Sequence, residues 1–254
     1  MDQKSIGSNY TAVVLAAGFG SRISEMTDRP KCLLELNGKT LLERSFDIWK
    51  QLGIKKINLV LGYKKELIQK VADNYKNDFE FSFYLNEDYR NQGNTFSLYL
   101  GIREIHGPCL IFDADLVYEQ KILAEFIEDS EKSEILVGPG YLTDIECAKT
   151  LVDSKNFARM TVDKRAVSES ELEKYKFAGE AIGILKFNKA HTEKLSNKAS
   201  EFLSKKENIN LNWEHLLNNF LLNEEVGVHK FESGKWIEID TSEDFKEAQD
   251  LFER

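Results

Sequence analysis

The stretch Val13-Val-Leu-Ala-Ala-Gly-Phe-Gly-Ser-Arg22 joins a short apolar run to a glycine-containing loop, and Pro30-Lys31 closes that loop. The apolar run is typical of a buried strand. Gly18 and Gly20 have no side chain, so the backbone there tolerates a positive φ and can approach a ligand closely. Exposed N–H groups in such a loop suit anionic oxygens, and Arg22 and Lys31 add positive charge. The stretch therefore predicts a nucleoside triphosphate site at the start of an α/β domain.

Two common phosphate-binding motifs do not fit this part of the sequence. A dinucleotide fingerprint needs a third glycine at position 23, which is Ile23, so a Rossmann dehydrogenase is a poor match. Gly38-Lys39-Thr40 imitates the end of a P-loop, but the glycine that a P-loop needs at position 33 is Leu33. The loop after the first strand remains the candidate anion site, with a purely structural turn as the alternative.

Composition limits the classes of partner. The 254 residues are 42% hydrophobic, enough for the core of one domain, and the formal charge of −9 argues against nucleic acid as a partner. The cysteines Cys32, Cys109 and Cys147 lack metal-ligand spacing, which predicts free thiols in a reducing compartment. We see neither a signal peptide nor an apolar run of membrane-spanning length. We therefore expect a cytoplasmic protein without a membrane partner.

Strand and helix patterns alternate through the first half of the chain. Expected strands cover 10–16, 57–61, 79–85 and 108–112, and expected helices cover 40–52, 64–75, 95–105 and 119–129. Gly53 is placed to end the first of these helices. This alternation predicts an α/β fold with a mostly parallel sheet flanked by helices.

The second half is less regular. We expect strands over 135–138, 148–153, 157–162, 181–187, 226–231 and 236–239, and helices over 190–205, 211–222 and 244–252. No linker or repeat interrupts the chain. We therefore expect one domain over 1–254, with a polar arm at 1–10 and an elaboration at about 140–235.

Paired carboxylates follow two of the expected strands. Asp113 and Asp115 share one face at the end of an apolar strand, at the sheet edge where ligands of α/β proteins bind. Glu238 and Asp240 share a face in the same way. Such oxygen ligands suit Mg²⁺ bound beside phosphates. Helix capping is the alternative for Asp115, and Thr241 or Ser242 could cap the last helix.

The whole motif, Leu15-Ala-Ala-Gly-Phe-Gly-Ser-Arg22 with Pro30-Lys31-Cys32-Leu33 and Gly38-Lys39, resembles the signature of nucleotidyltransferases that make nucleotide-activated sugars and alcohols. The resemblance implies a Rossmann-like, mostly parallel (mixed) sheet of the nucleotide-diphospho-sugar transferase type. The loop Asn91-Gln-Gly-Asn94, the absence of a second proline at position 32, and Trp213-Glu214 resemble cytidylyltransferases that act on phosphocholine or 2-aminoethylphosphonate. Asn94 is also a natural N-cap for the helix that follows.

The resemblance implies transfer of CMP from CTP to a small phospho-alcohol or phosphonate, with release of pyrophosphate. The CDP-activated product would serve cell-surface glycan or lipid decoration. A homodimer stays open. The alternatives are a sugar-1-phosphate enzyme that uses UTP or dTTP, and a non-catalytic nucleotide-sensing module. The four histidines match no nucleophile motif, so we expect no covalent catalysis.

Roles for single residues also follow from the resemblance. Lys31 and Arg22 are expected to be catalytic, and Asp115 and Asp240 are expected to hold Mg²⁺. Nucleotide binding is expected of Leu15, Ala16, Ala17, Gly18, Gly20, Ser21, Arg22, Asn91, Gly93, Asn94, Ser97 and Asp113. A cationic acceptor would suit Glu180 together with aromatic faces from Trp213, Trp236 or Tyr141, although the tryptophans could instead fill the core.

Overall fold

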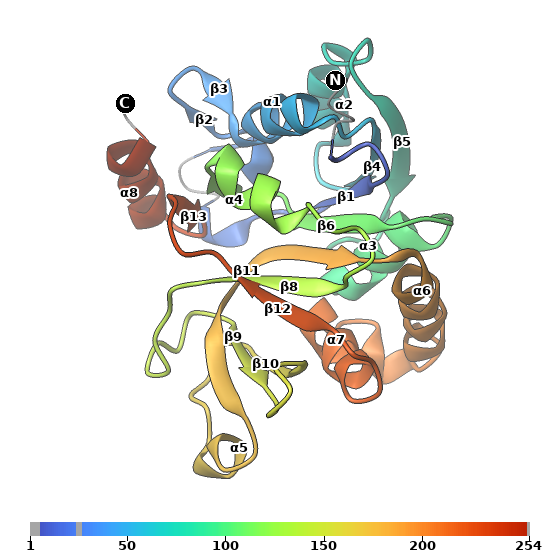
Figure 1. Ribbon diagram of the computed structural model, residues 1–254. Helices are drawn as coiled ribbons and strands as arrows, with labels where there is room; N and C mark the ends of the chain where they lie inside the picture. The colour runs from blue at the N-terminus through green and yellow to red at the C-terminus, as the bar shows by residue number, and fades with distance from the viewer. Residues whose placement is uncertain (1–5, 24–26, 253–254) are drawn as a thin grey trace, which may run out of the picture.

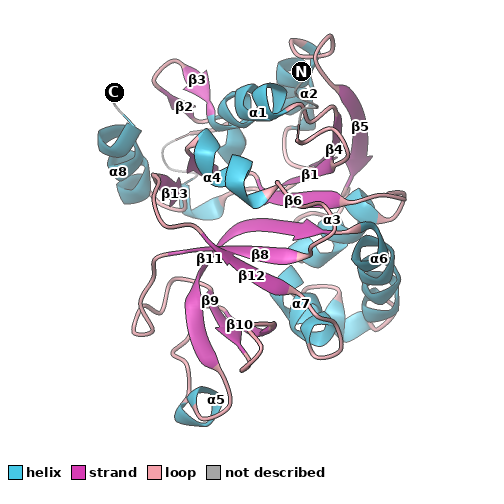
Figure 2. Ribbon diagram, in the orientation of Figure 1, coloured by secondary structure: helices cyan, strands magenta, loops and turns pink. Residues whose placement is uncertain are grey.

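The computed structural model describes residues 6–23 and 27–252. Residues 1–5 of the expected polar arm and residues 24–26 of the glycine loop lie outside the described residues, and so does the side chain of Ser21. The described chain forms a central sheet between two layers of helices (Figure 1), and the strands run through the middle of the molecule (Figure 2).

Nine of the described strands form one mixed sheet, in the order β10-β9-β11-β6-β1-β4-β5 with β8 and β12 joined beside β11. The first half of the chain supplies parallel neighbours, namely β1 (Thr11–Ala16), β4 (Lys56–Leu61), β5 (Glu80–Leu85) and β6 (Cys109–Asp113). The second half supplies β8 (Glu134–Gly138), β9 (Lys149–Val152), β10 (Ala158–Val162), β11 (Lys176–Phe187) and β12 (Gly227–Lys230). Because β11 runs antiparallel to β6, β8 and β9, the predicted mostly parallel, mixed sheet is confirmed.

Helices cover both faces of the sheet (Figure 1). One buried cluster joins the sheet to α1 (Leu41–Leu52), α2 (Lys65–Asp73) and α4 (Gln120–Phe126). A second cluster joins the other face to α3 (Asn94–Ile102), α6 (Lys189–Leu203) and α7 (Trp213–Leu221). A smaller cluster holds α8 (Ser242–Phe252) beside the glycine loop. The short α5 (Glu169–Leu172) was not expected from the sequence. No helix in the described ranges is both long and apolar enough to cross a membrane.

Local signals explain some helix ends and miss others. Gly53 ends α1 at φ 79°, as predicted, and Thr40 caps its other end. The prediction that Asn94 caps its own helix is wrong, because the N-cap of α3 is Gly93. Asp115 does not cap α4 either, since that N-cap is Glu119. All three cysteines are buried and free.

The parallel register and two small strand pairs bring residues that are distant in the sequence to one edge of the central sheet. Leu15 of β1 lies in register with Asp113 of β6, so the loops after both strands leave the sheet together. A separate pair joins β7 (Leu116–Tyr118) to β13 (Trp236–Glu238). The N–H of Ile239 donates to the carbonyl of Asp115 (3.0 Å), which sets the last strand beside the end of β6. The other short pair is β2 (Glu35–Leu36) with β3 (Lys39–Thr40).

Candidate active site

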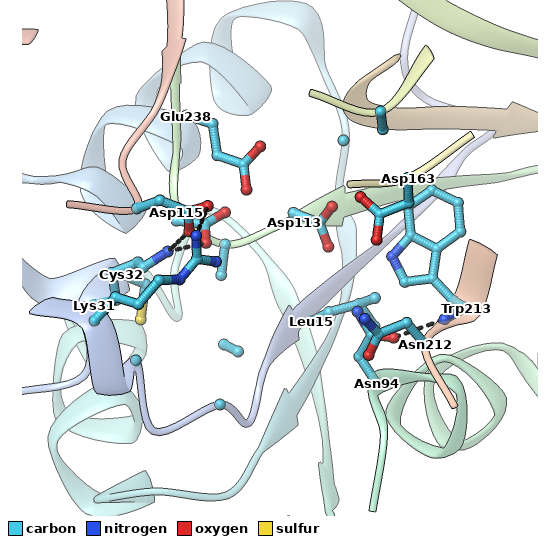
Figure 3. A pocket seen from close by; sticks show the side chains of 18 of the residues that line it. Leu15, Lys31, Cys32, Asn94, Asp113, Asp115, Asp163, Asn212, Trp213 and Glu238 are labelled. Carbon is cyan, nitrogen blue, oxygen red and sulfur yellow. Dashed lines mark hydrogen bonds and ion pairs between the residues drawn. The ribbon is translucent and has the colours of Figure 1, made fainter. Parts of the chain in front are cut away.

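A cavity of about 280 Å³ opens at the carboxyl ends of β1 and β6. The structure brings together in its wall the predicted residues Leu15, Ala16, Gly18, Gly20, Arg22, Lys31, Asn94, Asp113, Asp115, Trp213 and Asp240. Figure 3 shows two groups of side chains: Lys31, Asp115 and Glu238 on one side, and Asp163, Asn94 and Trp213 on the other. We call these the carboxylate side and the Trp213 side of the cavity.

Lys31 lies between two carboxylates on the carboxylate side. Its Nζ is 2.7 Å from Oδ2 of Asp115 and 2.6 Å from Oδ1 of Asp240. Arg22 adds a second cation, with Nη1 2.7 Å from Oδ2 of Asp240. Burial disfavours the charge of Lys31, but the attraction of both carboxylates outweighs it and raises the pKa of Lys31. The lysine therefore stays protonated, and this part of the cavity already accommodates a positive charge.

Three carboxylates in this group fit a divalent cation. Ligand oxygens of Asp115, Glu238 and Asp240 all lie within 4.8 Å of one another. Oδ1 of Asp115 is buried and has no hydrogen-bond partner among the described residues. Hard carboxylate oxygens with a free coordination atom are the donor set that Mg²⁺ prefers. Glu238 was not assigned as a ligand from the sequence, although its position on the same strand face as Asp240 was a usable signal.

The backbone of Asp240 is fixed by the start of α8. Asp244 accepts hydrogen bonds from the N–H groups of Asp240 (2.9 Å) and Thr241 (2.7 Å), while the hydroxyl of Thr241 accepts from the N–H of Asp244 (3.2 Å). The capping role predicted for Thr241 is therefore confirmed. This capping arrangement holds Asp240, one of the three clustered carboxylates, at the end of β13.

The loop after β1 has the conformation that its glycines permit. Gly20 adopts φ 66°, a value that L side chains rarely adopt, whereas Gly18 lines the cavity without a positive φ. A Cβ at Gly18 would meet nothing within 4 Å. This openness leaves space for a ligand against the backbone. The turn is thus not merely a packed structural feature.

Three charged residues that the sequence did not single out as site residues also line the cavity: Asp163 on the Trp213 side, Lys164 and Glu214. Lys164 stands in a turn after β10 with φ 46°. Oε2 of Glu214 is buried without a partner among the described residues, and burial, followed by repulsion from Asp163, raises the pKa of Glu214 to about 7. Asp163-Lys164 follows an apolar strand just as Asp113 does, and this pattern could have found the pair.

Three residues predicted for the acceptor do not reach the cavity wall. Glu180 is excluded because its neighbour Ala181 lines the cavity and successive strand residues point to opposite faces. Instead Glu180 packs against Gly140, where burial raises its pKa to about 7. Tyr141 is 77% exposed on a surface loop. Trp236 packs beside Gly138 against the core, so the core-filling alternative holds for this tryptophan.

Four residues predicted to bind the nucleotide also lie outside the wall. The carbonyl of Ala17 accepts from the N–H of Tyr63, and the buried hydroxyl of Ser97 accepts from the amide of Asn86 (3.1 Å). The amide of Asn91 donates to Asp88, while Gly93 packs on the backbone of the segment before α7. Asn91 and Gly93 therefore shape the loop before Asn94, which does line the cavity.

Comparison with known protein families identifies the class of protein to which this cavity belongs. The chain matches the MobA-like NTP transferase domain over residues 12–144. The chain belongs to this family. It is therefore a nucleotidyltransferase, in agreement with the resemblance seen in the glycine loop. The family match covers β1, the glycine loop, Lys31 and both carboxylates after β6.

Relatives extend the match over the rest of the chain. A choline-phosphate cytidylyltransferase of Streptococcus pneumoniae is 25% identical over 252 residues, covering 94% of this chain and 97% of the relative. A CTP:phosphoglutamine cytidylyltransferase of Campylobacter jejuni is 29% identical over 193 residues, covering 70% of this chain and 72% of the relative.

Solved structures confirm the predicted type of fold. The CTP:phosphocholine cytidylyltransferase from Streptococcus pneumoniae has a TM-score of 0.78 at 21% identity, covering 96% of this chain and 99% of that one. The inositol-1-phosphate CTP transferase from T. maritima has a TM-score of 0.74 at 22% identity, covering 96% of each chain. The described sheet is thus of the nucleotide-diphospho-sugar transferase type.

Proposed function

We propose that this nucleotidyltransferase uses CTP and Mg²⁺ to transfer CMP to a small acceptor that carries a phosphate or phosphonate and a cationic group. Pyrophosphate leaves. The activated product, CDP-linked for a phosphate acceptor and CMP-linked for a phosphonate, serves the decoration of a cell-surface glycan or lipid. The observation behind the proposal is the pairing, in one cavity, of a carboxylate cluster around Lys31 with an acidic wall around Trp213. The names of the relatives support CTP and such acceptors.

The carboxylate side suits the triphosphate. Asp115, Glu238 and Asp240 would hold Mg²⁺, which supplies positive charge against the phosphates when it is bound. Lys31 donates to the α-phosphate oxygens once the nucleotide is present. Arg22 and the backbone from Gly18 to Gly20 are positioned for the leaving β- and γ-phosphates.

The acceptor needs little proton chemistry. Its phosphate or phosphonate oxygen is already ionised at neutral pH, so in-line attack on the α-phosphorus requires no strong general base. The site's contribution is to position two anions and to stabilise the developing charge. Lys164 also lines the cavity, where its charge acts on Glu214 as well as on Glu238 and Asp240, and its ammonium suits the acceptor's phosphate.

The Trp213 side suits the cationic end of the acceptor. Trp213 is only 4% exposed and belongs to a buried cluster, so it fills the core as the alternative predicted, but it also lines the cavity together with Asp163 and Glu214. An aromatic face and carboxylates together attract a choline or aminoethyl ammonium group. A neutral sugar would leave these charges without a partner, which disfavours the sugar-1-phosphate alternative.

The direct test is pyrophosphate release from four nucleotides with four acceptors: phosphocholine, 2-aminoethylphosphonate, phosphoglutamine and glucose 1-phosphate. We expect turnover with CTP and a cationic acceptor, and only with Mg²⁺ present. Turnover of UTP or dTTP with glucose 1-phosphate alone would contradict the proposal. Nucleotide binding without release for every pair would point to nucleotide sensing.

The metal assignment has its own test. Asp115→Asn keeps the size of the side chain but removes one charge from the carboxylate cluster. We expect loss of Mg²⁺-dependent turnover with an unchanged circular dichroism spectrum, because the remaining carboxylates no longer balance the cation. Asp47→Asn, at a carboxylate paired with Lys39 away from the cavity, is the matched control. A normal Mg²⁺ titration for Asp115→Asn would refute the assignment.

A further inference from the structure

The start of α3 is bonded to the segment that leads into α7, although more than a hundred residues separate them. The N–H of Gly93 donates to the carbonyl of Ile209 (2.9 Å), and the hydroxyl of Thr95 donates to the carbonyl of Leu211 (2.7 Å). Between them, Oδ1 of Asn94 accepts the N–H of Trp213 (2.7 Å), as Figure 3 shows. We call this set of three bonds the 93–213 junction.

Asn94 supplies a cap that α7 does not supply for itself. The N-cap residue of α7 is Asn212, whose side chain makes no capping hydrogen bond. The first N–H groups of a helix have no partner inside it. Asn94 satisfies one of them, at Trp213, from a different helix. The orientation of the first turn of α7, with Trp213 and Glu214, therefore depends on a residue of α3.

The junction is closely fitted. A Cβ at Gly93 would lie 2.1 Å from the carbonyl oxygen of Leu211, a contact that no side-chain rotation relieves. The two backbones are thus held at a fixed separation. A small shift of the loop before α3 must be passed on to the segment before α7, because no flexible side chain lies between them.

Asn94 also faces the cavity, together with Leu15 and Asn212. Its oxygen is engaged by Trp213, and no described residue accepts a bond from its amide nitrogen. The amide N–H groups are therefore available as donors to a ligand near Leu15. One planar group can then bind a ligand through nitrogen and orient α7 through oxygen.

We propose that Asn94 is a positioning residue that couples nucleotide binding to the acceptor side of the cavity. The inference rests on the proposed function. A nucleotide that accepts a bond from the amide nitrogen holds the oxygen on the N–H of Trp213, and so fixes Trp213 and Glu214 for the acceptor. By linkage, the acceptor strengthens nucleotide binding by the same factor.

Two variants distinguish the role of the amide oxygen of Asn94 from that of its amide nitrogen. Asn94→Ala removes both groups, whereas Asn94→Asp keeps an accepting oxygen and removes the nitrogen. The readouts are hydrogen exchange at the backbone N–H of Trp213, with and without CTP, and the KM and kcat for CTP and phosphocholine. Asn219→Ala, on the exposed face of α7, is the matched control. Circular dichroism checks that each variant is folded.

In the wild type we expect CTP to slow exchange at Trp213. Asn94→Ala loses this effect and raises the acceptor KM about tenfold, the cost of a lost helix cap, with kcat changed much less. Asn94→Asp still accepts the bond from Trp213, so exchange at Trp213 stays slow without CTP. It lacks the amide donors, so CTP no longer slows the exchange further and the KM for CTP rises. The control behaves like the wild type.

Two results would overturn the inference. Wild-type exchange at Trp213 in Asn94→Ala would show that the cap has no effect. A raised KM for CTP with an unchanged acceptor KM would reduce Asn94 to a nucleotide contact. The exchange experiment needs no turnover, so it decides the role of Asn94 even if the wild type transfers CMP to none of the four acceptors, which would defeat the proposed function alone.

Discussion

Among single residues, Lys31 has the most constrained surroundings in the cavity. Its ammonium is shared by Asp115 and Asp240, which lie more than a hundred residues apart in the sequence. The sequence could predict its presence in the site, because Lys31 belongs to the same local motif as the glycine loop. Its partners could not be derived from local spacing, since Asp240 arrives through the pairing of β13 with β7.

We expect Lys31→Ala to lower kcat by ~10²-fold or more, since one group that stabilises developing charge typically contributes that much. Steady-state pyrophosphate release at saturating substrates measures the effect. Lys39→Ala removes an exposed lysine eight residues away and is the control. A kcat at the wild-type level for Lys31→Ala would exclude a role at the α-phosphate.

Glu214 predicts a pH dependence. Burial raises its pKa to about 7, so the carboxylate becomes mostly ionised only between pH 6 and pH 8. If it faces the acceptor's ammonium, the acceptor KM falls about tenfold over this range, in proportion to the ionised fraction. Glu214→Gln should raise the KM and flatten its profile, and a wild-type profile that stays flat would refute the contact.

Glu214 also makes the stability of the folded protein depend on pH, and its raised pKa determines the direction of that dependence. Between the ordinary glutamate pKa and about 7, the folded state binds more protons at Glu214 than the unfolded state does. Stability contributed by this site therefore falls as pH rises through that window. Thermal melts from pH 5 to pH 8 should show a smaller decline for Glu214→Gln than for the wild type.

Among elements, the regular helices and parallel strands were predictable because their signals are local. The apolar spacing, the Thr40 cap and the Gly53 stop of α1 all lie within fourteen residues, and the structure agrees with each. Asn94 shows where local reasoning fails. A capping residue one position inside a helix can serve another helix, and only tertiary packing reveals which N–H it meets.

The Thr40 cap gives a prediction for α1. Thr40 accepts from the N–H of Glu43 (3.2 Å), and the Glu43 carboxylate accepts from the N–H of Thr40 (2.9 Å). We expect Thr40→Ala to lower the free energy of unfolding by about 0.5–2 kcal/mol. Urea denaturation measures this, with the exposed Thr143→Ala as control. Equal unfolding midpoints for the two variants would contradict the capping role.

In the whole molecule, both halves of the chain contribute residues to each side of the cavity. The parallel half brings the glycine loop and the carboxylates after β6 to one edge, an arrangement that strand patterns predict. The wall around Trp213 comes from the turn after β10 and the start of α7. The strand-end pattern could have found Asp163 and Lys164, but Glu214 lies in a different segment of the chain, so the local sequence could not show that it meets them.

Gly93→Ala tests how tightly the two segments of the 93–213 junction are packed. The added methyl group would collide with the backbone of Leu211, and relieving the collision must move one segment. We expect a loss of stability of about 1–3 kcal/mol, as for other overpacked sites. Gly107→Ala, where a Cβ meets nothing within 4 Å, is the control for denaturation melts. Identical denaturation melts for both variants would show that the 93–213 junction accommodates the added methyl group without loss of stability.

The pairing of β13 with β7 also has a consequence during synthesis. Asp240 follows one of the last strands, and it reaches Asp115 only when Ile239 bonds to the carbonyl of that residue. Synthesis must therefore pass residue 240 before the carboxylate cluster can form. A chain that stops before this residue lacks one of the three clustered carboxylates. The cluster to which we assign Mg²⁺ is therefore one of the later parts of the cavity to be completed.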